Sequence, residues 1–144
     1  MTKSNVLFLC TGNSARSQMA EAFLRHHAGD RFEVFSAGLE PKGINPYTIR
    51  IMDEIGIDIR EQTSDSVNSI GGRRYYSYII TVCSHADENC PAGVVAMGRE
   101  KLHWPFDDPA LATGSDEEIM TAFRNVRDEI EAKIKAWIGE LETA

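Results

Sequence analysis

A cysteine and an arginine lie six positions apart in the stretch from Cys10 to Ser17, with a glycine between them. A loop that wraps an anion turns its backbone N–H groups inward, and Gly12 and Asn13 are residue types that tolerate the unusual backbone angles this requires. The guanidinium of Arg16 matches two oxygens of a tetrahedral oxyanion. The same positive field favours the thiolate form of Cys10. The pattern therefore predicts an oxyanion-binding loop with Cys10 as its nucleophile.

The predicted substrate-binding residues make up the whole loop after this cysteine. They are Thr11, Gly12, Asn13, Ser14, Ala15, Arg16 and Ser17. We also expect the Ser17 hydroxyl to donate a hydrogen bond to the Cys10 sulfur. A cysteine and an arginine at this spacing often occur together by chance, so an inert cysteine at the end of a buried strand remains the alternative.

The other two cysteines, Cys83 and Cys90, bear on the class of reaction. Hydrolysis of a phosphoester needs one thiol, whereas a reduction needs two electrons, which a pair of thiols supplies by becoming a disulfide. The two cysteines are seven positions apart. Residues at that spacing in an α-helix lie about 10 Å apart, and a disulfide needs Cα atoms within about 6 Å. A bond between these two cysteines therefore requires their segment to unwind. Two alternatives remain: both thiols are inert core residues, or they bind zinc together with His85 and Asp87.

A proton donor is needed near the loop, because an oxygen displaced from a tetrahedral oxyanion must leave in protonated form. Asp108, followed by Pro109, lies in an expected loop before a long helix, which suits such a carboxylic acid. The alternative is that the aspartate and the proline only form a turn, which both residue types favour. Asp107 is the second candidate for the acid.

Nearly continuous apolar runs predict buried strands at residues 5–9, 32–36 and 78–82. Cys10 and Cys83 each directly follow one of these strands. Sites in open α/β sheets lie at the carboxyl ends of the strands, so we expect both thiols on the same edge of the sheet.

Helical spacing of apolar residues predicts a helix that follows the loop and ends near Gly29, a second from Pro46 to Gly56 and a long third from Ser115 to Leu141. Asn45 is the expected cap of the second, and Ser115 with Glu118 forms a capping box for the third. Strands that alternate with helices predict a three-layer α/β fold with a parallel sheet, built as a single domain over residues 1–144. Residues 71–74 are expected to form an exposed turn.

The composition is that of an ordinary globular protein, with 42% hydrophobic and 26% charged residues. The 15 basic and 22 acidic residues give a formal net charge of −7, which disfavours nucleic acid and anionic membranes as partners. No stretch has the apolar length needed to cross a bilayer, and the run at residues 6–9 is too short for a signal-peptide core. We therefore expect a cytoplasmic protein whose three cysteines form no permanent disulfide.

Further motifs extend the loop pattern over nearly the whole chain. They are Gln18-Met19-Ala20-Glu21, Ser36-Ala37-Gly38, Gly56-Ile57-Asp58-Ile59, Gln62-Thr63-Ser64-Asp65 and His103-Trp104-Pro105-Phe106-Asp107-Asp108-Pro109. Together with the loop they resemble the low-molecular-weight tyrosine phosphatase superfamily, and within it the thioredoxin-coupled arsenate reductases rather than the phosphatases proper. The resemblance implies a four-stranded parallel sheet flanked by helices.

The resemblance also implies a relay of three thiols that reduces arsenate to arsenite and so confers arsenical resistance. Cys10 would attack arsenate while Asp108 protonates the departing oxygen. Cys83 would then attack Cys10 and release arsenite, Cys90 would attack Cys83, and thioredoxin would reduce the resulting disulfide. The expected partners are arsenate and thioredoxin, with no nucleic acid and no membrane, and we expect a monomer with no tightly bound cofactor.

The same branch implies a potassium site near the loop, with Asn13, Glu21, Ser36 and Asp65 as ligands. The alternative is that these residues brace the loop through hydrogen bonds alone. One departure is Ala15, where some relatives carry a further cysteine to which the relay assigns no required part.

Two other functions remain open at the level of sequence. A low-molecular-weight phosphatase would use Cys10, Arg16 and Asp108 but neither of the other cysteines. Gln18 counts against it, because those phosphatases usually have proline there. A protein that only binds oxyanions, or that senses redox state through a disulfide, is the non-enzymatic alternative.

Overall fold

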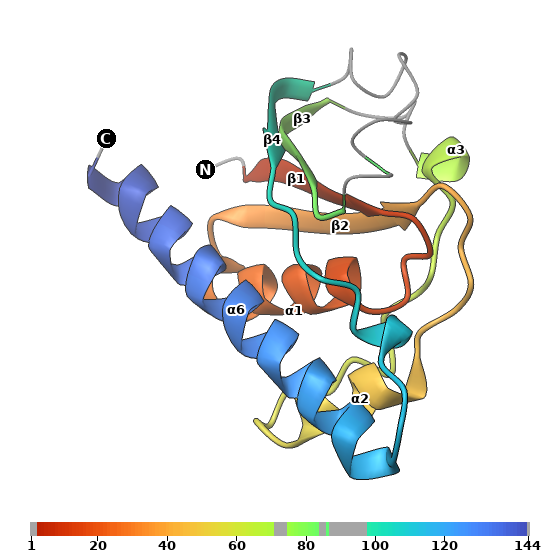
Figure 1. Cartoon of the computed structure of the whole chain (residues 1–144). Coiled ribbons are helices and arrows are strands. Elements are labelled where there is room, and N and C mark those ends of the chain that lie inside the picture. The colour runs from red at the N-terminus through yellow and green to blue at the C-terminus, as the bar shows by residue number, and fades with distance from the viewer. Residues whose placement is uncertain (1–2, 71–74, 84–85, 87–97, 144) are drawn as a thin grey trace.

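The computed structural model describes residues 3–70, 75–83, 86 and 98–143. The predicted turn at 71–74 and the side chain of Cys90 lie outside these ranges. In chain order the elements (Figure 1) are β1 (Ser4–Cys10), α1 (Arg16–Ala28), β2 (Phe32–Gly38), α2 (Pro46–Asp53), α3 (Val67–Ile70), β3 (Tyr76–Thr81), β4 (Gly98–His103), the 3₁₀ helix η1 (Pro109–Leu111) and α6 (Asp116–Thr143).

The strands form one four-stranded parallel sheet in the order β2-β1-β3-β4. Because all four run in the same direction, their carboxyl ends meet at one edge. Cys10 is the last residue of β1, and Cys83 lies just beyond the end of β3 at Thr81. The prediction that both thiols share one edge of the sheet is confirmed.

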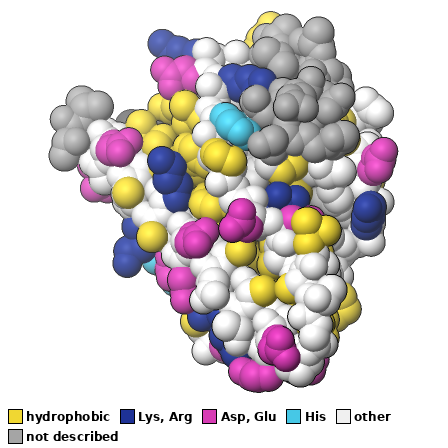
Figure 2. All heavy atoms as spheres, viewed as in Figure 1, with side chains coloured by type: hydrophobic (Ala, Val, Ile, Leu, Met, Phe, Trp, Pro, Cys, Tyr) yellow, Lys and Arg dark blue, Asp and Glu magenta, His cyan; other side chains and the backbone are white. Residues whose placement is uncertain are grey.

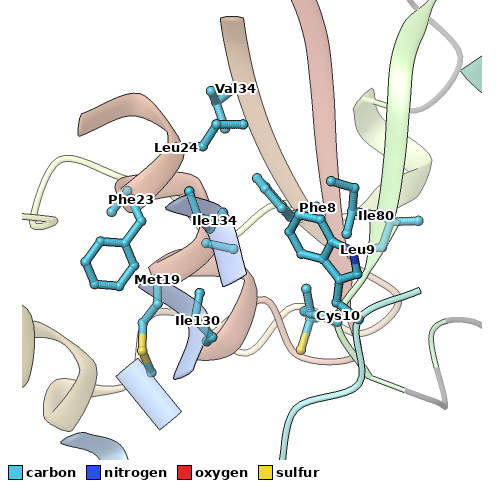
Figure 3. Close-up of a cluster of buried hydrophobic side chains, with 14 of the residues drawn as sticks. Phe8, Leu9, Cys10, Met19, Phe23, Leu24, Val34, Ile80, Ile130 and Ile134 are labelled. Atoms are coloured by element: carbon cyan, nitrogen blue, oxygen red, sulfur yellow. The ribbon is translucent and has the colours of Figure 1, made fainter. Parts of the chain in front are cut away.

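Helices α1 and α6 pack together on one face of the sheet, with α2 beside α6, and the short α3 lies near the end of β2 (Figure 1). Figure 3 shows the side chains that fill the space between these layers, among them Met19 of α1, Val34 of β2 and Ile134 of α6. These three belong to one buried cluster with Phe8 and Leu9 of the central strand. The predicted α/β class is confirmed.

Strand β4 is the element that patterning does not predict. Its sequence Gly98–His103 is polar and most of its side chains are exposed, whereas the strand at the other edge of the sheet, β2, is mostly buried. The fourth strand follows from the family resemblance alone, and that expectation is confirmed.

The predicted helix caps are also confirmed. The Asn45 side chain accepts a hydrogen bond from the backbone N–H of Tyr47 at 2.8 Å. Ser115 accepts one from the N–H of Glu118 at 3.1 Å, and the Glu118 carboxylate accepts one from the N–H of Ser115 at 3.4 Å. These caps fix the starts of α2 and α6, and the chain between β4 and η1 brings Asp108 to the edge of the sheet that carries the thiols.

No helix within the described ranges is long and apolar enough to cross a membrane. Figure 2 shows acidic and basic side chains interspersed over the described part of one face.

Candidate active site

A pocket of about 560 Å³ opens at the carboxyl edge of the sheet. The loop after β1 forms one wall through residues 10–12 and 14–16, and the segment after β4 forms the opposite wall through residues 105–108 and 110. Lys42 and Cys83 complete the lining. The fold therefore gathers most of the predicted site residues around one cavity.

The loop after β1 is held from outside by the segment that follows β2. The N–H groups of Leu39, Glu40 and Lys42 donate to the carbonyls of Cys10, Thr11 and Gly12 at 3.2, 2.8 and 2.9 Å. In a planar trans peptide the N–H points opposite to the C=O. Since these carbonyls point away toward residues 39–42, the N–H groups of the same peptide units point the other way. Amides arranged like this form an anion-binding nest at the start of α1.

Asn13 gives the loop its sharp turn. Its φ of +45° lies in the left-handed region, which asparagine tolerates better than most residues. Its side-chain Oδ1 accepts hydrogen bonds from the Ser17 hydroxyl at 2.8 Å and from Gln18 Nε2 at 3.1 Å. A second bond from Gln18 Nε2 reaches the Asn13 carbonyl at 2.9 Å. These bonds fix the backbone conformation on which the nest depends.

The structure corrects two details of the predicted loop. The Ser17 hydroxyl donates to Asn13 and not to the Cys10 sulfur, because the first turn of α1 directs it under the loop. Asn13 and Ser17 are fully buried and do not line the pocket. Both residues therefore shape the loop from behind, whereas Thr11, Gly12, Ser14, Ala15 and Arg16 face the cavity.

Arg16 connects the two walls of the pocket. Its side chain is only 11% exposed, and its Nη1 donates to the carbonyl of Phe106 at 3.1 Å. Its Nη2 lies 3.5 Å from Oδ2 of Asp108. The other oxygen of Asp108 accepts a hydrogen bond from the N–H of Ala110 at 3.0 Å, which caps η1. The carboxylate is thus positioned both by a turn and by the guanidinium, so the turn role and the catalytic role do not exclude each other.

The two described cysteines are unoxidised and buried, and both line the pocket. The interaction with the Cys10 thiol lowers the pKa of Cys83 to about 5, and the Thr11 hydroxyl and the N–H of Ala86, both 3.4 Å from the sulfur, add to the effect. The interaction with Cys83, together with burial, raises the pKa of Cys10 against the opposing charge of Arg16. The two thiols therefore titrate as a pair that shares one negative charge, and that charge is available for the thiolate expected at Cys10.

Three residues of the implied potassium site, Glu21, Ser36 and Asp65, line a separate cavity of about 290 Å³. The Ser36 hydroxyl donates to one oxygen of Glu21 at 2.5 Å, and Arg25 Nη2 lies 2.6 Å from the other. Asn13 does not line this cavity, although its Nδ2 donates to the Asp65 carbonyl at 3.5 Å. The oxygen atoms of these residues are ligands of the kind that alkali and alkaline-earth cations bind. The Glu21 carboxylate, however, already forms an ion pair with Arg25.

The zinc alternative depends on His85, Asp87 and Cys90, which all lie outside the described residues. In the described ranges, no group of three or more His, Cys, Asp or Glu side chains could hold a metal ion.

Sequence reasoning missed three features of the pocket region. They are Lys42 in the lining, the Phe106 carbonyl that anchors Arg16, and Gly38, where an added Cβ would lie 2.7 Å from the Thr11 carbonyl. Gly38 belongs to a quoted motif, but nothing in that motif shows which backbone it approaches. The other two arise from contacts between distant segments and leave no local pattern.

Residues 5–144 match the low molecular weight phosphotyrosine protein phosphatase family, and the chain belongs to it. Within that family it is similar to proteins named arsenate reductase. One from Halalkalibacterium halodurans is 48% identical over 137 residues, covering 95% of this chain and 96% of the relative. One from Bacillus subtilis is 44% identical over 135 residues, covering 94% and 95%.

Solved structures give the same picture. An arsenate reductase in the oxidized state superposes with a TM-score of 0.80 at 31% identity, covering 95% of this chain and 98% of that one. The predicted family resemblance is confirmed, and the chain is an enzyme.

Proposed function

We propose that this enzyme reduces arsenate to arsenite. The observation that carries the proposal is that Cys10 and Cys83, both unoxidised, line one oxyanion pocket. Two electrons are needed to convert arsenic(V) to arsenic(III), and two adjacent thiols can supply them by forming a disulfide. The similarity to relatives named arsenate reductase supports the same substrate.

Substrate binding falls to the loop amides and Arg16. Backbone N–H groups and the N-terminal end of α1 favour a bound anion, and the guanidinium offers two parallel donors to its oxygens. When an anion binds, Arg16 has to share its donors between substrate, Phe106 and Asp108. Asp108 lines the pocket beside Arg16, where a carboxylic acid can protonate the departing oxygen of the bound anion.

In the first chemical step the Cys10 sulfur attacks arsenic. A proton passes from Cys10 to Cys83, since the two thiols titrate as a coupled pair, and this gives Cys10 the thiolate that it needs. A sulfur–arsenic bond forms, an arsenic–oxygen bond breaks, and Asp108 protonates the departing oxygen so that it leaves as water. Arsenic remains in the +5 state, now bound to Cys10.

In the second step Cys83 gives up the proton that it accepted from Cys10, to solvent or to the Asp108 carboxylate that the first step leaves, and its thiolate attacks the sulfur of Cys10. A sulfur–sulfur bond forms while the sulfur–arsenic bond breaks, and its electron pair stays with arsenic, which leaves as arsenite. The Thr11 hydroxyl and the N–H of Ala86 support this step, because both contact the Cys83 sulfur at 3.4 Å and favour its charged form. The enzyme is left with a Cys10–Cys83 disulfide.

The proposal is completed by Cys90 and thioredoxin. Cys90 attacks Cys83 and frees Cys10, and thioredoxin reduces the Cys83–Cys90 disulfide in the reducing environment of the cytoplasm. This part rests on the family resemblance, since Cys90 lies outside the described residues. Thiol exchange through mixed disulfides gives each transfer a defined chemical route.

Hydrolysis of phosphomonoesters is the second candidate, because the loop, Arg16 and Asp108 would serve phosphate as well as arsenate. The presence of Cys83 beside Cys10 in the pocket lining counts against it as the main activity. A hydrolase gains nothing from a second thiol that can attack the first. We expect weak side activity on an aryl phosphate.

Potassium enters the proposal as a support for the loop and takes no part in the chemistry. Glu21, Ser36 and Asp65 would hold the ion, in competition with the Arg25 guanidinium for Glu21. We expect potassium chloride to raise the melting temperature above that in choline chloride at equal ionic strength, and Arg25→Gln to enlarge the difference. Equal melting temperatures in both salts for both proteins would remove potassium from the account.

The proposed function is tested by measuring arsenite formed from arsenate with thioredoxin, thioredoxin reductase and NADPH, beside hydrolysis of an aryl phosphate by the same preparation. We expect arsenite in amounts equal to the NADPH consumed, and only slow hydrolysis. Fast hydrolysis without arsenite would favour the phosphatase. Reduction with glutaredoxin and glutathione but not with thioredoxin would keep the reductase and change its partner.

A further inference from the structure

We propose that Lys42 is a substrate-binding and specificity-determining residue that favours doubly charged oxyanions in this pocket. The inference rests on the proposed function, which supplies the oxyanion substrate. The choice of Lys42 rests on the geometry of the segment after β2. Lys42 is the second cation among the residues that line the pocket, beside Arg16.

The Lys42 backbone is fixed to the oxyanion loop. Its N–H donates to the carbonyl of Gly12 at 2.9 Å, and the next residue, Gly43, donates its N–H to the Ser64 hydroxyl at 3.1 Å. The Ser64 hydroxyl in turn lies 3.4 Å from the same Gly12 carbonyl. Lys42 therefore projects from a fixed point beside the loop, although its side chain is exposed.

The side chain of Lys42 lies over Gly12. A Cβ built on Gly12 would be 3.5 Å from Cδ and 3.7 Å from Cγ of Lys42. The methylene groups thus cover the loop at the position where glycine leaves room for them. A lysine with its stem against apolar or backbone surface keeps its ammonium group in water, and Lys42 is among the residues that line the pocket.

The charges around the pocket give this ammonium group its role. Arg16 is ion-paired with Asp108, whereas the Lys42 ammonium has no ion pair within the part of the chain that the structure describes. Asp107, Asp108 and the thiolate of the cysteine pair outnumber the two cations of the lining before substrate binds. An incoming dianion meets this excess of negative charge in a protein whose formal net charge is −7. Lys42 offsets that repulsion, and it does so more for a dianion than for a monoanion.

The test measures how well inorganic phosphate or arsenate protects Cys10 from alkylation by iodoacetamide, read on the Cys10 peptide by mass spectrometry. The neutral reagent is not itself attracted by Lys42, and the half-protecting anion concentration reports affinity without any turnover. We expect Lys42→Gln to raise this concentration about 5- to 10-fold at low ionic strength, and Lys42→Glu to raise it further. Lys42→Arg should stay within about twofold of the wild type.

Lys135→Gln is the matched control, because it makes the same charge change at an exposed position of α6 outside the pocket lining. It should leave the affinity unchanged. Added salt should shrink the difference between wild type and Lys42→Gln. The loss in Lys42→Gln should also be larger above the second ionisation of phosphate than below it, where the anion carries a single charge.

Equal affinity of Lys42→Gln and wild type at low ionic strength would overturn the inference, and so would an equal loss in Lys135→Gln, which would reveal only an effect of net charge. The inference and the proposed function can fail separately. If phosphate protects Cys10 in a Lys42-dependent way but no arsenite forms, Lys42 keeps its role and the reductase proposal fails. If arsenite forms and Lys42→Gln binds phosphate as the wild type does, the reductase proposal stands and the role of Lys42 fails.

Discussion

The loop after β1 and the short segment after β3 both begin with a thiol at the carboxyl edge of the sheet, but they are built differently. Asn13 and Ser17 of the first are fully buried and bonded to each other. The Cys83 sulfur of the second is met by the Thr11 hydroxyl and the N–H of Ala86. The first region is shaped to hold a tetrahedral anion, and the second needs only to keep a charged sulfur within reach of Cys10.

This difference separates binding from electron supply. An oxyanion loop with one thiol is enough for hydrolysis, whereas the second sulfur adds a route by which two electrons leave the protein. Substitutions at the first region should therefore damage every activity of the pocket, and those at the second should damage reduction alone.

The largest expected effect is that of Cys10→Ser. Removing the nucleophile should lower both arsenite formation and aryl phosphate hydrolysis by on the order of 10⁴-fold or more. Both rates are measured on the same preparation, with circular dichroism as the control for folding. Retention of either activity would show that a different group attacks the substrate.

Asp108→Asn should have the next largest effect. Loss of general acid catalysis is expected to lower the rate of arsenite formation by about 10²- to 10³-fold. Asp107→Asn is the matched control, because Asp107 lines the same pocket and carries the same charge, and it should lower the rate only a few-fold. Reversed sizes of the two effects would assign the acid to Asp107.

The fold and the loop could be predicted from the sequence to different extents. β1, β2 and β3 are predicted because they are buried runs, whereas the polar edge strand β4 carries no such signal. The cap at Asn45 depends on neighbours in sequence and is predicted correctly. The Ser17 partner is predicted wrongly, because the direction of a hydroxyl in the first helical turn depends on the fold of Asn13.

The electrostatics of the thiols also depend on contacts that sequence does not show. Cys10 and Cys83 stand far apart in the chain, and only the pairing of β1 with β3 brings their sulfurs together. The coupling of their pKa values follows from that proximity. Lys42 and the Phe106 carbonyl reach the pocket in the same way, from loops that follow other strands.

Because the two thiols are coupled, the pH dependence of Cys83 alkylation should change when Cys10 is removed. Its pKa is lowered to about 5, so its alkylation by iodoacetamide should have an inflection near pH 5 and fall below it as the thiolate is protonated. Cys10→Ala removes the largest cause, so the inflection should move up toward the ordinary cysteine value of about 8.5. Thr11→Val should move it in the same direction by less. An inflection that stays in place in Cys10→Ala would mean that the two thiols are not coupled.

The smallest expected effect is that of packing behind the loop. An added Cβ at Gly38 would lie 2.7 Å from the Thr11 carbonyl oxygen and 2.9 Å from the Asn13 nitrogen. Gly38→Ala should therefore lower the free energy of unfolding by about 1–3 kcal/mol and weaken phosphate binding. Gly139→Ala on α6, where nothing lies within 4 Å of the added Cβ, should raise it by about 1 kcal/mol. Urea unfolding measures both, and an unaffected Gly38→Ala would show that the loop tolerates displacement.

The central claim is that Cys83 attacks the sulfur of Cys10, so that the two thiols become a disulfide and arsenic receives two electrons. The direct test mixes fully reduced enzyme with arsenate in the absence of any reductant, and then measures arsenite and remaining thiols. We predict that wild type forms a single arsenite per chain with the loss of two thiols, and that Cys83→Ser forms none while it still hydrolyses an aryl phosphate. Arsenite from Cys83→Ser at the wild-type yield would contradict the account.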